Sequence, residues 1–114
     1  MGEPFYEYRV YEAVPGKLAT LNRRFETTTL RLFARHGFKL VGMWQPLIGS
    51  SAELHYMLEW DDMDARDRAW AAFRADPEWQ SAVAESERGG PIVVRVRNEL
   101  WRSAPYAPRP RGSG

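Results

Sequence analysis

Apolar and aromatic residues alternate with polar ones in several parts of the chain, as they do in half-buried strands. Residues 5–14 (FYEYRVYEAV) and 92–101 (IVVRVRNELW) are rich in aromatic and β-branched side chains, and glycine or proline lies next to each run. Residues 38–48 and 53–60 have the same character, with Gly49-Ser50-Ser51 between them. The pattern predicts four strands, with the second and third joined in a hairpin.

Two other stretches repeat apolar residues near the 3.6-residue period of a helix. In residues 17–36 these apolar residues form one stripe, although threonines at 27–29 weaken the helix propensity, and Gly37 follows where a left-handed C-cap belongs. Residues 63–74 follow a pair of aspartates that can cap a helix. Asp76-Pro77 restarts a helix, because aspartate suits the cap and proline the first helical position.

The order of these elements is strand, helix, strand, strand, helix, strand, which is the ferredoxin-like βαββαβ arrangement. It predicts an α+β fold, in which a four-stranded antiparallel sheet has its helices on one face. Residues 1–102 are expected to form this domain. Residues 103–114, a tail rich in proline, arginine and glycine, are expected to be poorly ordered.

Alternation along each strand assigns side chains to the two faces of the sheet. The polar and aromatic residues expected beneath the helices are Tyr6, Tyr8, Tyr56, Trp60 and Asn98, with Trp44 as a further candidate. The residues expected on the reverse face are Glu7, Arg9, Tyr11, His55, Met57, Glu59, Arg95, Arg97, Glu99 and Trp101. Charges of both signs beside large apolar groups favour a homodimer interface there, and a solvated face is the alternative.

The composition excludes several classes of protein. The 114 residues are 44% hydrophobic and 13% aromatic, which suits one domain with a well-filled core. A net charge of +1, from 16 basic and 15 acidic residues, argues against binding to nucleic acid. The absence of cysteine excludes disulfides and thiolate chemistry. No signal peptide and no apolar run of roughly 20 residues is visible, so we expect a cytoplasmic protein without a membrane segment.

Motifs for metals and cofactors are also lacking. The sequence has no glycine-rich phosphate loop and no nucleophile elbow. His36 and His55 lie far apart, and neither belongs to a zinc-binding pattern. We therefore predict no metal and no cofactor, with haem ligation by one of the histidines as a remote alternative.

The side chains assigned to the helix side predict a small-molecule site. A buried hydroxyl or amide without a partner costs about 1–3 kcal/mol, so several together indicate polar anchors in an apolar cavity. The expected substrate-binding residues are Tyr6, Trp44, Trp60, Asn98 and Arg9. The expected catalytic residues are Tyr56, His55 and Tyr8. Histidine suits proton transfer and a guanidinium suits a carboxylate. The alternatives are a filled aromatic core, an interface histidine and an Arg9–Glu7 structural pair.

A set of short segments carries a resemblance to a known family. They are Phe5-Tyr6-Glu7 with Arg9 and Tyr11, Pro15-Gly16-Lys17, Arg35-His36-Gly37-Phe38-Lys39-Leu40-Val41-Gly42 with Trp44, Ile48-Gly49, Ala75-Asp76-Pro77-Glu78-Trp79, and Asn98 with Leu100 and Ala104-Pro105. Together they span nearly the whole folded chain, and they resemble the NIPSNAP family.

The resemblance implies a dimeric α+β barrel, in which two ferredoxin-like sheets face each other. Antibiotic-biosynthesis monooxygenases share this assembly, and such relatives usually bind ligands between a sheet and its own helices. The sequence departs from the family on the third strand, where Ala52, Tyr56 and Leu58 replace the usual Asn, His and Trp, and Arg97 replaces a common Glu. If those polar residues serve a family activity, this chain has changed or lost it.

Two functional hypotheses follow. In the first, the protein binds a hydrophobic or aromatic metabolite between sheet and helices and acts on it without a cofactor, as an oxygenase, isomerase or cyclase of secondary metabolism. In the second, it is a non-catalytic module that contacts another protein through its dimer, loops or tail. A ligand-sized cavity would favour the first hypothesis, and a filled interior the second.

Overall fold

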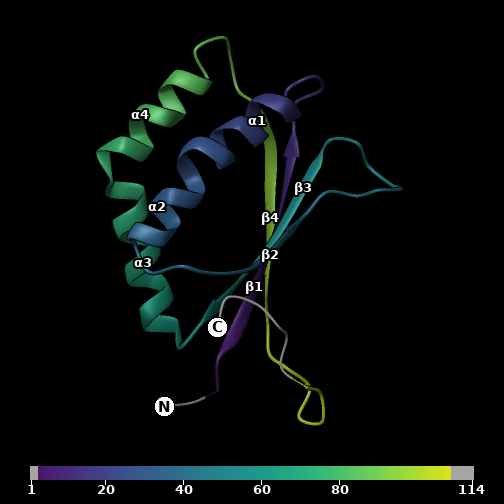
Figure 1. Ribbon diagram of the computed structural model, residues 1–114, viewed down its shortest axis with the longest axis vertical. Helices are drawn as coiled ribbons and strands as arrows, with labels where there is room; N and C mark the ends of the chain where they lie inside the picture. The colour runs from purple at the N-terminus through teal and green to yellow at the C-terminus, as the bar shows by residue number, and fades with distance from the viewer. Residues whose placement is uncertain (1–2, 109–114) are drawn as a thin grey trace.

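The first strand, β1 (Phe5–Ala13), is one of the two inner strands of the sheet. The computed structural model describes residues 3–108, and its elements are β1 (Phe5–Ala13), α1 (Leu18–Arg24), η1 (Phe25–Thr29), α2 (Leu30–Arg35), β2 (Lys39–Trp44), β3 (Glu53–Trp60), α3 (Met63–Ala75), α4 (Pro77–Ser86) and β4 (Val93–Trp101). The strand order is β2-β3-β1-β4, and neighbouring strands are antiparallel. The helices lie together on one side of the sheet (Figure 1). The predicted ferredoxin-like α+β fold is confirmed.

The first predicted helix is interrupted by a π-helical turn. It is observed as α1, η1 and α2, which follow one another without a break. Within η1, Thr27 Oγ1 donates to the carbonyl of Arg23 at 2.7 Å, and Thr29 Oγ1 donates to that of Arg24 at 3.4 Å. Hydroxyls bonded to preceding carbonyls compete with the regular backbone ladder, which gives a physical reason for the wider turn.

Aspartates begin the two later helices. At the start of α3, Asp62 Oδ1 accepts from the backbone N–H of Ala65 at 2.8 Å, and at the start of α4, Asp76 Oδ1 accepts from that of Glu78 at 2.9 Å. Pro77 occupies the first turn of α4, where its missing N–H costs nothing. Both predicted helix starts are confirmed.

Strand β2 is shorter than the sequence predicts. It ends at Trp44, and residues 45–52 form a loop that projects beyond the sheet at the right of Figure 1. Pro46 has no N–H for the ladder and Gly49 adopts a φ of +135°, so the chain leaves the sheet here. Leu47 and Ile48, expected on the strand, are 98% and 93% exposed.

The faces predicted for β1 are reversed in the structure. Arg9 lies directly opposite Tyr56 on β3 and Asn98 on β4, and side chains in opposite positions share a face. Odd-numbered residues of β1 therefore point toward the helices, whereas Tyr6 and Tyr8 point to the reverse face. The faces predicted for β3 and β4 are correct.

The reason for the error lies in the burial of β1 on both of its faces. On the reverse face, Tyr6 and Val10 are only 4% and 2% exposed, while beneath the helices Glu7 is 0% exposed. Hydrophobic alternation assumes that charged residues meet solvent. Here Glu7 and Arg9 satisfy each other beneath the helices, so alternation selects the wrong face.

The core lies between the helix-facing side of the sheet and the helices. Aromatic rings dominate it: Phe33 stacks on Phe38 with centroids 4.4 Å apart, and Trp70 meets Phe38 edge-on at 4.8 Å. Within residues 3–108, no helix has the length and apolar character needed to cross a membrane. Residues 109–114 of the predicted tail lie outside the described residues.

Candidate functional site

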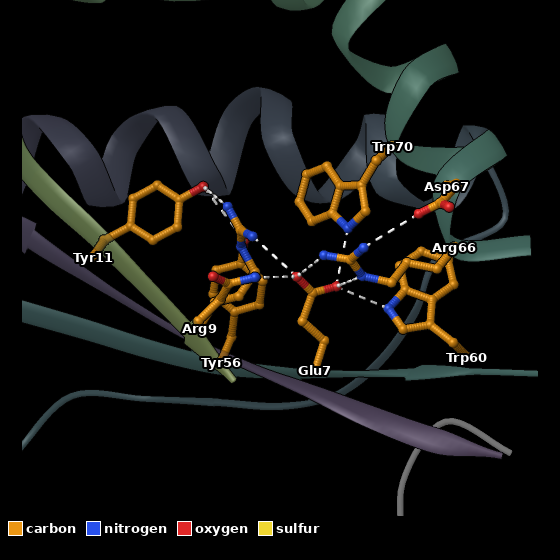
Figure 2. A network of polar contacts seen from close by, with 9 residues as sticks. Glu7, Arg9, Tyr11, Tyr56, Trp60, Arg66, Asp67 and Trp70 are labelled. Carbon is orange, nitrogen blue, oxygen red and sulfur yellow. Dashed lines mark hydrogen bonds and ion pairs between the residues drawn. The ribbon is translucent and has the colours of Figure 1, made fainter. Parts of the chain in front are cut away.

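A fully buried carboxylate, that of Glu7, occupies the centre of the helix-facing side (Figure 2). Its oxygens accept hydrogen bonds from Arg66 Nε and Nη2, Trp60 Nε1 and Trp70 Nε1, all at 3.0 Å, and from Asn98 Nδ2 and Arg9 Nη1 at 3.1 Å. The donors come from β1, β3, β4 and α3. A buried charge is stable only with such partners, so this carboxylate joins the sheet to α3.

Two opposing effects act on the pKa of Glu7. Burial by itself would raise the pKa, because the carboxylate loses its hydration. Hydrogen bonds from Arg66, Trp70 and Asn98, together with the charge of Arg9, outweigh burial and lower the pKa to about 2. Glu7 is therefore an anion at neutral pH, with its oxygens engaged by the protein, and it is better suited to anchoring than to accepting a proton from a ligand.

Arg9 extends the network from Glu7 along the sheet. Its Nε donates to Tyr56 Oη at 2.9 Å and its Nη2 to Tyr11 Oη at 3.5 Å, while its guanidinium carbon lies 4.4 Å from the centroid of the Trp70 ring. A guanidinium has five N–H groups, and the contacts to Glu7, Tyr56 and Tyr11 engage three of its nitrogens through one N–H each. Burial raises the pKa of Tyr56, which keeps this phenol neutral.

A cavity of about 170 Å³ opens beside this network and is lined by Arg9, Arg66, Asp67, Trp70 and Arg74. Arg66 pairs with Glu7 at 3.0 Å and with Asp67 at 3.3 Å. Arg74 lies 5.9 Å from the centroid of the Trp70 ring and pairs with no carboxylate among residues 3–108. Three arginines thus face two carboxylates, and the cavity has a net positive charge.

An apolar strip lies on β4, the strand next to the one that carries Arg9. On the helix-facing side, Asn98 lies opposite Arg9. Val96 lies opposite Tyr11, and Leu100 lies opposite Glu7. Val96 and Leu100 are 40% and 41% exposed, so the described helices leave this edge strand largely uncovered. We call the cavity and this strip together the arginine groove.

Half of the predicted site residues lie at this network. Trp60 and Asn98 donate to Glu7, and Tyr56 accepts from Arg9. The placement of Arg9 on the reverse face was wrong, because the ion pair with Glu7 holds it beneath the helices. The assignment of these residues to substrate binding or catalysis stays a prediction.

The other predicted residues lie on the reverse face. Trp44 lies opposite His55, and Tyr8 Oη forms a hydrogen bond with His55 Nδ1. Tyr6 shares this face with Tyr8. The placement of Tyr6, Tyr8 and Trp44 beneath the helices was therefore wrong, since β1 is reversed and Trp44 follows the parity of His55. The single pocket expected from the sequence is divided between two faces.

Sequence reasoning missed the contribution of α3. Arg66, Trp70 and Arg74 are spaced by four residues, which places them on one helix face toward the sheet. That spacing was visible in the sequence. The spacing indicates a site only when Glu7 is known to lie beneath the helices, and strand alternation had assigned Glu7 to the reverse face.

The described residues show no metal centre. In residues 3–108, no group of at least three His, Cys, Asp or Glu side chains is arranged to hold a metal ion. His55 is close to Glu53, with Nε2 and Oε1 2.9 Å apart, and His36 Nε2 lies 2.8 Å from Asp76 Oδ2. Each histidine is thus engaged in a polar contact of its own.

Fold and site together define a small α+β protein of ferredoxin-like topology with an arginine-lined groove beside its helices. The chain matches the NIPSNAP family over residues 6–108 and belongs to that family. No curated protein matches the sequence.

Several solved structures are similar to this chain. An uncharacterized NIPSNAP-like domain protein from Burkholderia xenovorans is 22% identical, with a TM-score of 0.84 over 100% of this chain and 97% of that one. Protein Atu4242 from Agrobacterium tumefaciens is 25% identical, with a TM-score of 0.79 over 91% of this chain and 97% of that one. SnoaB from Streptomyces nogalater, a cofactor-independent oxygenase, is 18% identical, with a TM-score of 0.64 over 95% of this chain and 100% of its own.

Proposed function

We propose that this NIPSNAP-family protein binds an aromatic or hydrophobic metabolite that carries an anionic group, and that the arginine groove is its binding site. The observation that carries the proposal is the combination of Arg9 and Arg74 with an exposed apolar strip on β4. A carboxylate, phenolate or enolate would accept hydrogen bonds from the guanidinium groups, and its ring would lie against Trp70 and Val96.

The same arrangement favours chemistry without a cofactor. Arg9 would stabilise negative charge on an enolate or phenolate oxygen, a species common to oxygenation, isomerisation and cyclisation. SnoaB, which is 18% identical and has a similar fold, is a cofactor-independent oxygenase. The proposal carries that kind of chemistry over to this chain by analogy. If the protein is an oxygenase, it should consume O2 when a polycyclic phenol is the only reactant added. An oxygen electrode measures this consumption.

The test of binding uses 2-naphthoate, a planar aromatic acid. We expect it to shift the indole N–H signal of Trp70 in nitrogen–proton NMR spectra, and Arg74→Gln to weaken binding roughly tenfold through loss of a charged hydrogen bond. Arg88→Gln is the matched control, because Arg88 is exposed and pairs with Glu85 outside the groove. Equal affinity of the wild type and Arg74→Gln for 2-naphthoate would contradict the proposal, as would no binding at all.

We also propose that the protein forms a homodimer through the reverse face of its sheet. Trp44 and Trp101 are 51% and 42% exposed on this face, next to charged side chains of both signs. Large exposed apolar groups among charged side chains are typical of an interface that is closed by a partner. Sedimentation equilibrium should give twice the mass of one chain, and a monomer at every concentration would contradict the dimer.

A protein contact by the 45–52 loop is the second candidate function. Leu47 and Ile48 at its tip are almost fully exposed, which is unusual for two adjacent large apolar side chains. A Leu47→Ser/Ile48→Ser variant should keep its folding stability, since neither side chain contributes to the core. If this variant still dimerises, its ability to bind a protein partner can be compared directly with that of the wild type.

A further inference from the structure

Three polar side chains form a chain of contacts on the reverse face of the sheet, away from the arginine groove. Tyr8 on β1 and His55 on β3 are diagonal neighbours, since Tyr8 lies opposite Met57. Tyr8 Oη and His55 Nδ1 form a hydrogen bond, and His55 Nε2 lies 2.9 Å from Glu53 Oε1. The side chains of His55 and Glu53 are 19% and 23% exposed, so the contacts are partly sheltered from water.

The chemistry of these groups fixes the direction of the hydrogen bonds. An ionised carboxylate only accepts, so His55 Nε2 carries the hydrogen that Glu53 accepts. In the neutral imidazole, Nδ1 is then an acceptor, and it takes the hydroxyl hydrogen of Tyr8. The order Tyr8, His55, Glu53 therefore has the same roles as the nucleophile, histidine and carboxylate of a hydrolase triad, with a phenol in the first position.

A hollow of about 220 Å³ lies in front of Tyr8 and His55, and Trp44, Gln45 and Pro46 complete its lining. The Tyr8 ring is also stacked on Trp101, with centroids 4.8 Å apart and an interplanar angle of 17°. Gln45 Oε1 accepts from Asn22 Nδ2 at 2.8 Å, which leaves the amide N–H groups of Gln45 for other acceptors. Flat apolar walls with a few polar groups suit a planar ligand of one or two rings.

The charge of this hollow differs from that of the arginine groove. Glu53 ends the series of contacts from Tyr8 through His55, which we call the relay. Within the described residues, no arginine lines the hollow. An uncharged ligand is therefore favoured over an acid. A second subunit on this face, as proposed above, would shield the hollow from water.

We propose that this hollow is a second site, which binds an uncharged planar aromatic ketone or its enol and exchanges a proton with it through Tyr8. In the step, the C–H bond next to the carbonyl breaks and its proton goes to Tyr8 Oη, while the hydroxyl proton of Tyr8 goes to His55 Nδ1. The C–H electron pair forms the enolate double bond, and the carbonyl π pair moves to oxygen. Tyr8 Oη then gives a proton to that oxygen and takes one back from His55 Nδ1, which forms the enol and restores both residues. The net reaction is an isomerisation without an oxidant or reductant.

The relay explains why a tyrosine can act here. A phenol alone is a weak base, but Tyr8 gives its own proton to His55 as it receives the ligand's. Glu53 then pairs with the imidazolium that forms. Gln45 lines the hollow, and its amide N–H groups would donate hydrogen bonds to the enolate oxygen.

Hydrogen exchange of 2-tetralone in D2O tests the proposal. Proton NMR would follow the loss of the signal at the carbon between the carbonyl and the ring. We expect wild-type protein to accelerate exchange over buffer at least tenfold, and Tyr8→Phe and His55→Gln each to remove most of the acceleration. Tyr106→Phe is the control, because Tyr106 is 90% exposed and lies outside both sites. Its exchange rate should equal that of the wild type.

Binding of 2-naphthol, an uncharged planar enol, gives an independent readout of the same hollow. It should shift the indole signal of Trp44, and Trp44→Ala should weaken it at least fivefold while 2-naphthoate binding is unchanged. Absence of exchange catalysis, or full catalysis by both Tyr8→Phe and His55→Gln, would overturn the proposed proton transfer. Absence of 2-naphthol binding would overturn the site, whatever happens at the arginine groove.

Discussion

Glu7 and Arg9 form an ion pair at 3.1 Å between side chains that are 0% and 15% exposed. They are two residues apart on β1, so the pleat of the strand places both on the helix-facing side. Glu7 also binds donors from α3, and Arg9 also binds Tyr56 on β3. One polar network therefore connects the central strand to its neighbour and to a helix.

Glu7→Gln should lower the free energy of unfolding by about 3–5 kcal/mol, because it removes a fully buried charge from two half-buried arginines, Arg9 and Arg66. Urea unfolding followed by tryptophan fluorescence measures the change. Glu12→Gln is the matched control: Glu12 pairs with the more exposed Arg95 at 2.9 Å, and its loss should cost less than about 1 kcal/mol. Similar losses of unfolding free energy in the two variants would show that the Glu7 ion pairs contribute no more than an exposed pair does.

Acid should destabilise the protein through the same carboxylate. Folding lowers the pKa of Glu7 from 4.5 to about 2, so its contribution to stability is complete above the unfolded value and is lost as the pH falls through the folded one. The free energy of unfolding should fall by roughly 3 kcal/mol between about pH 5 and pH 2 from this group. Urea unfolding at a series of pH values should give a steeper dependence for wild type than for Glu7→Gln. Parallel curves would exclude Glu7 as the cause.

Tyr56→Phe should destabilise the protein by about 1–3 kcal/mol, because Arg9 Nε would lose a buried acceptor at 2.9 Å. It should also weaken 2-naphthoate binding, since Tyr56 positions the guanidinium. Tyr6→Phe is the control, because no hydrogen bond of the Tyr6 hydroxyl is found in the described part of the chain. A Tyr56→Phe protein as stable as Tyr6→Phe would mean that Arg9 does not depend on this phenol.

Gly42→Ala should displace the Trp44 ring. A Cβ at this position would lie 2.5 Å from Trp44 Cζ2, which is too close for two carbon atoms. We expect the Trp44 indole signal to move in nitrogen–proton NMR spectra and 2-naphthol binding to weaken. Gly89→Ala is the control, because a Cβ there meets no atom within 4 Å. An unchanged Trp44 signal would show that the ring does not cover Gly42.

The candidate site was predictable in its residue types but less so in its geometry. Tyr56, Trp60 and Asn98 were assigned to the correct face from strand alternation, because hydrophobic neighbours on β3 and on β4 mark the core side. β1 offered no such contrast, since aromatic residues occur on both of its faces. A buried ion pair then inverted the pattern that alternation uses.

The sequence by itself determined the order and type of the elements. Strand runs, aspartate caps and the Gly37 terminator are local signals, and they act within a few residues of where they occur. The resemblance to the NIPSNAP family also predicted the fold from local signals, because its motifs coincide with these turns and caps.

Only the tertiary structure decided which face of β1 meets the helices and thus which residues meet one another. Glu7 can be buried because its donors arrive from β3, β4 and α3, which are distant in sequence and converge only when the sheet and helix pack. The cost of burying a charge depends on those partners, and no local pattern along one strand contains them.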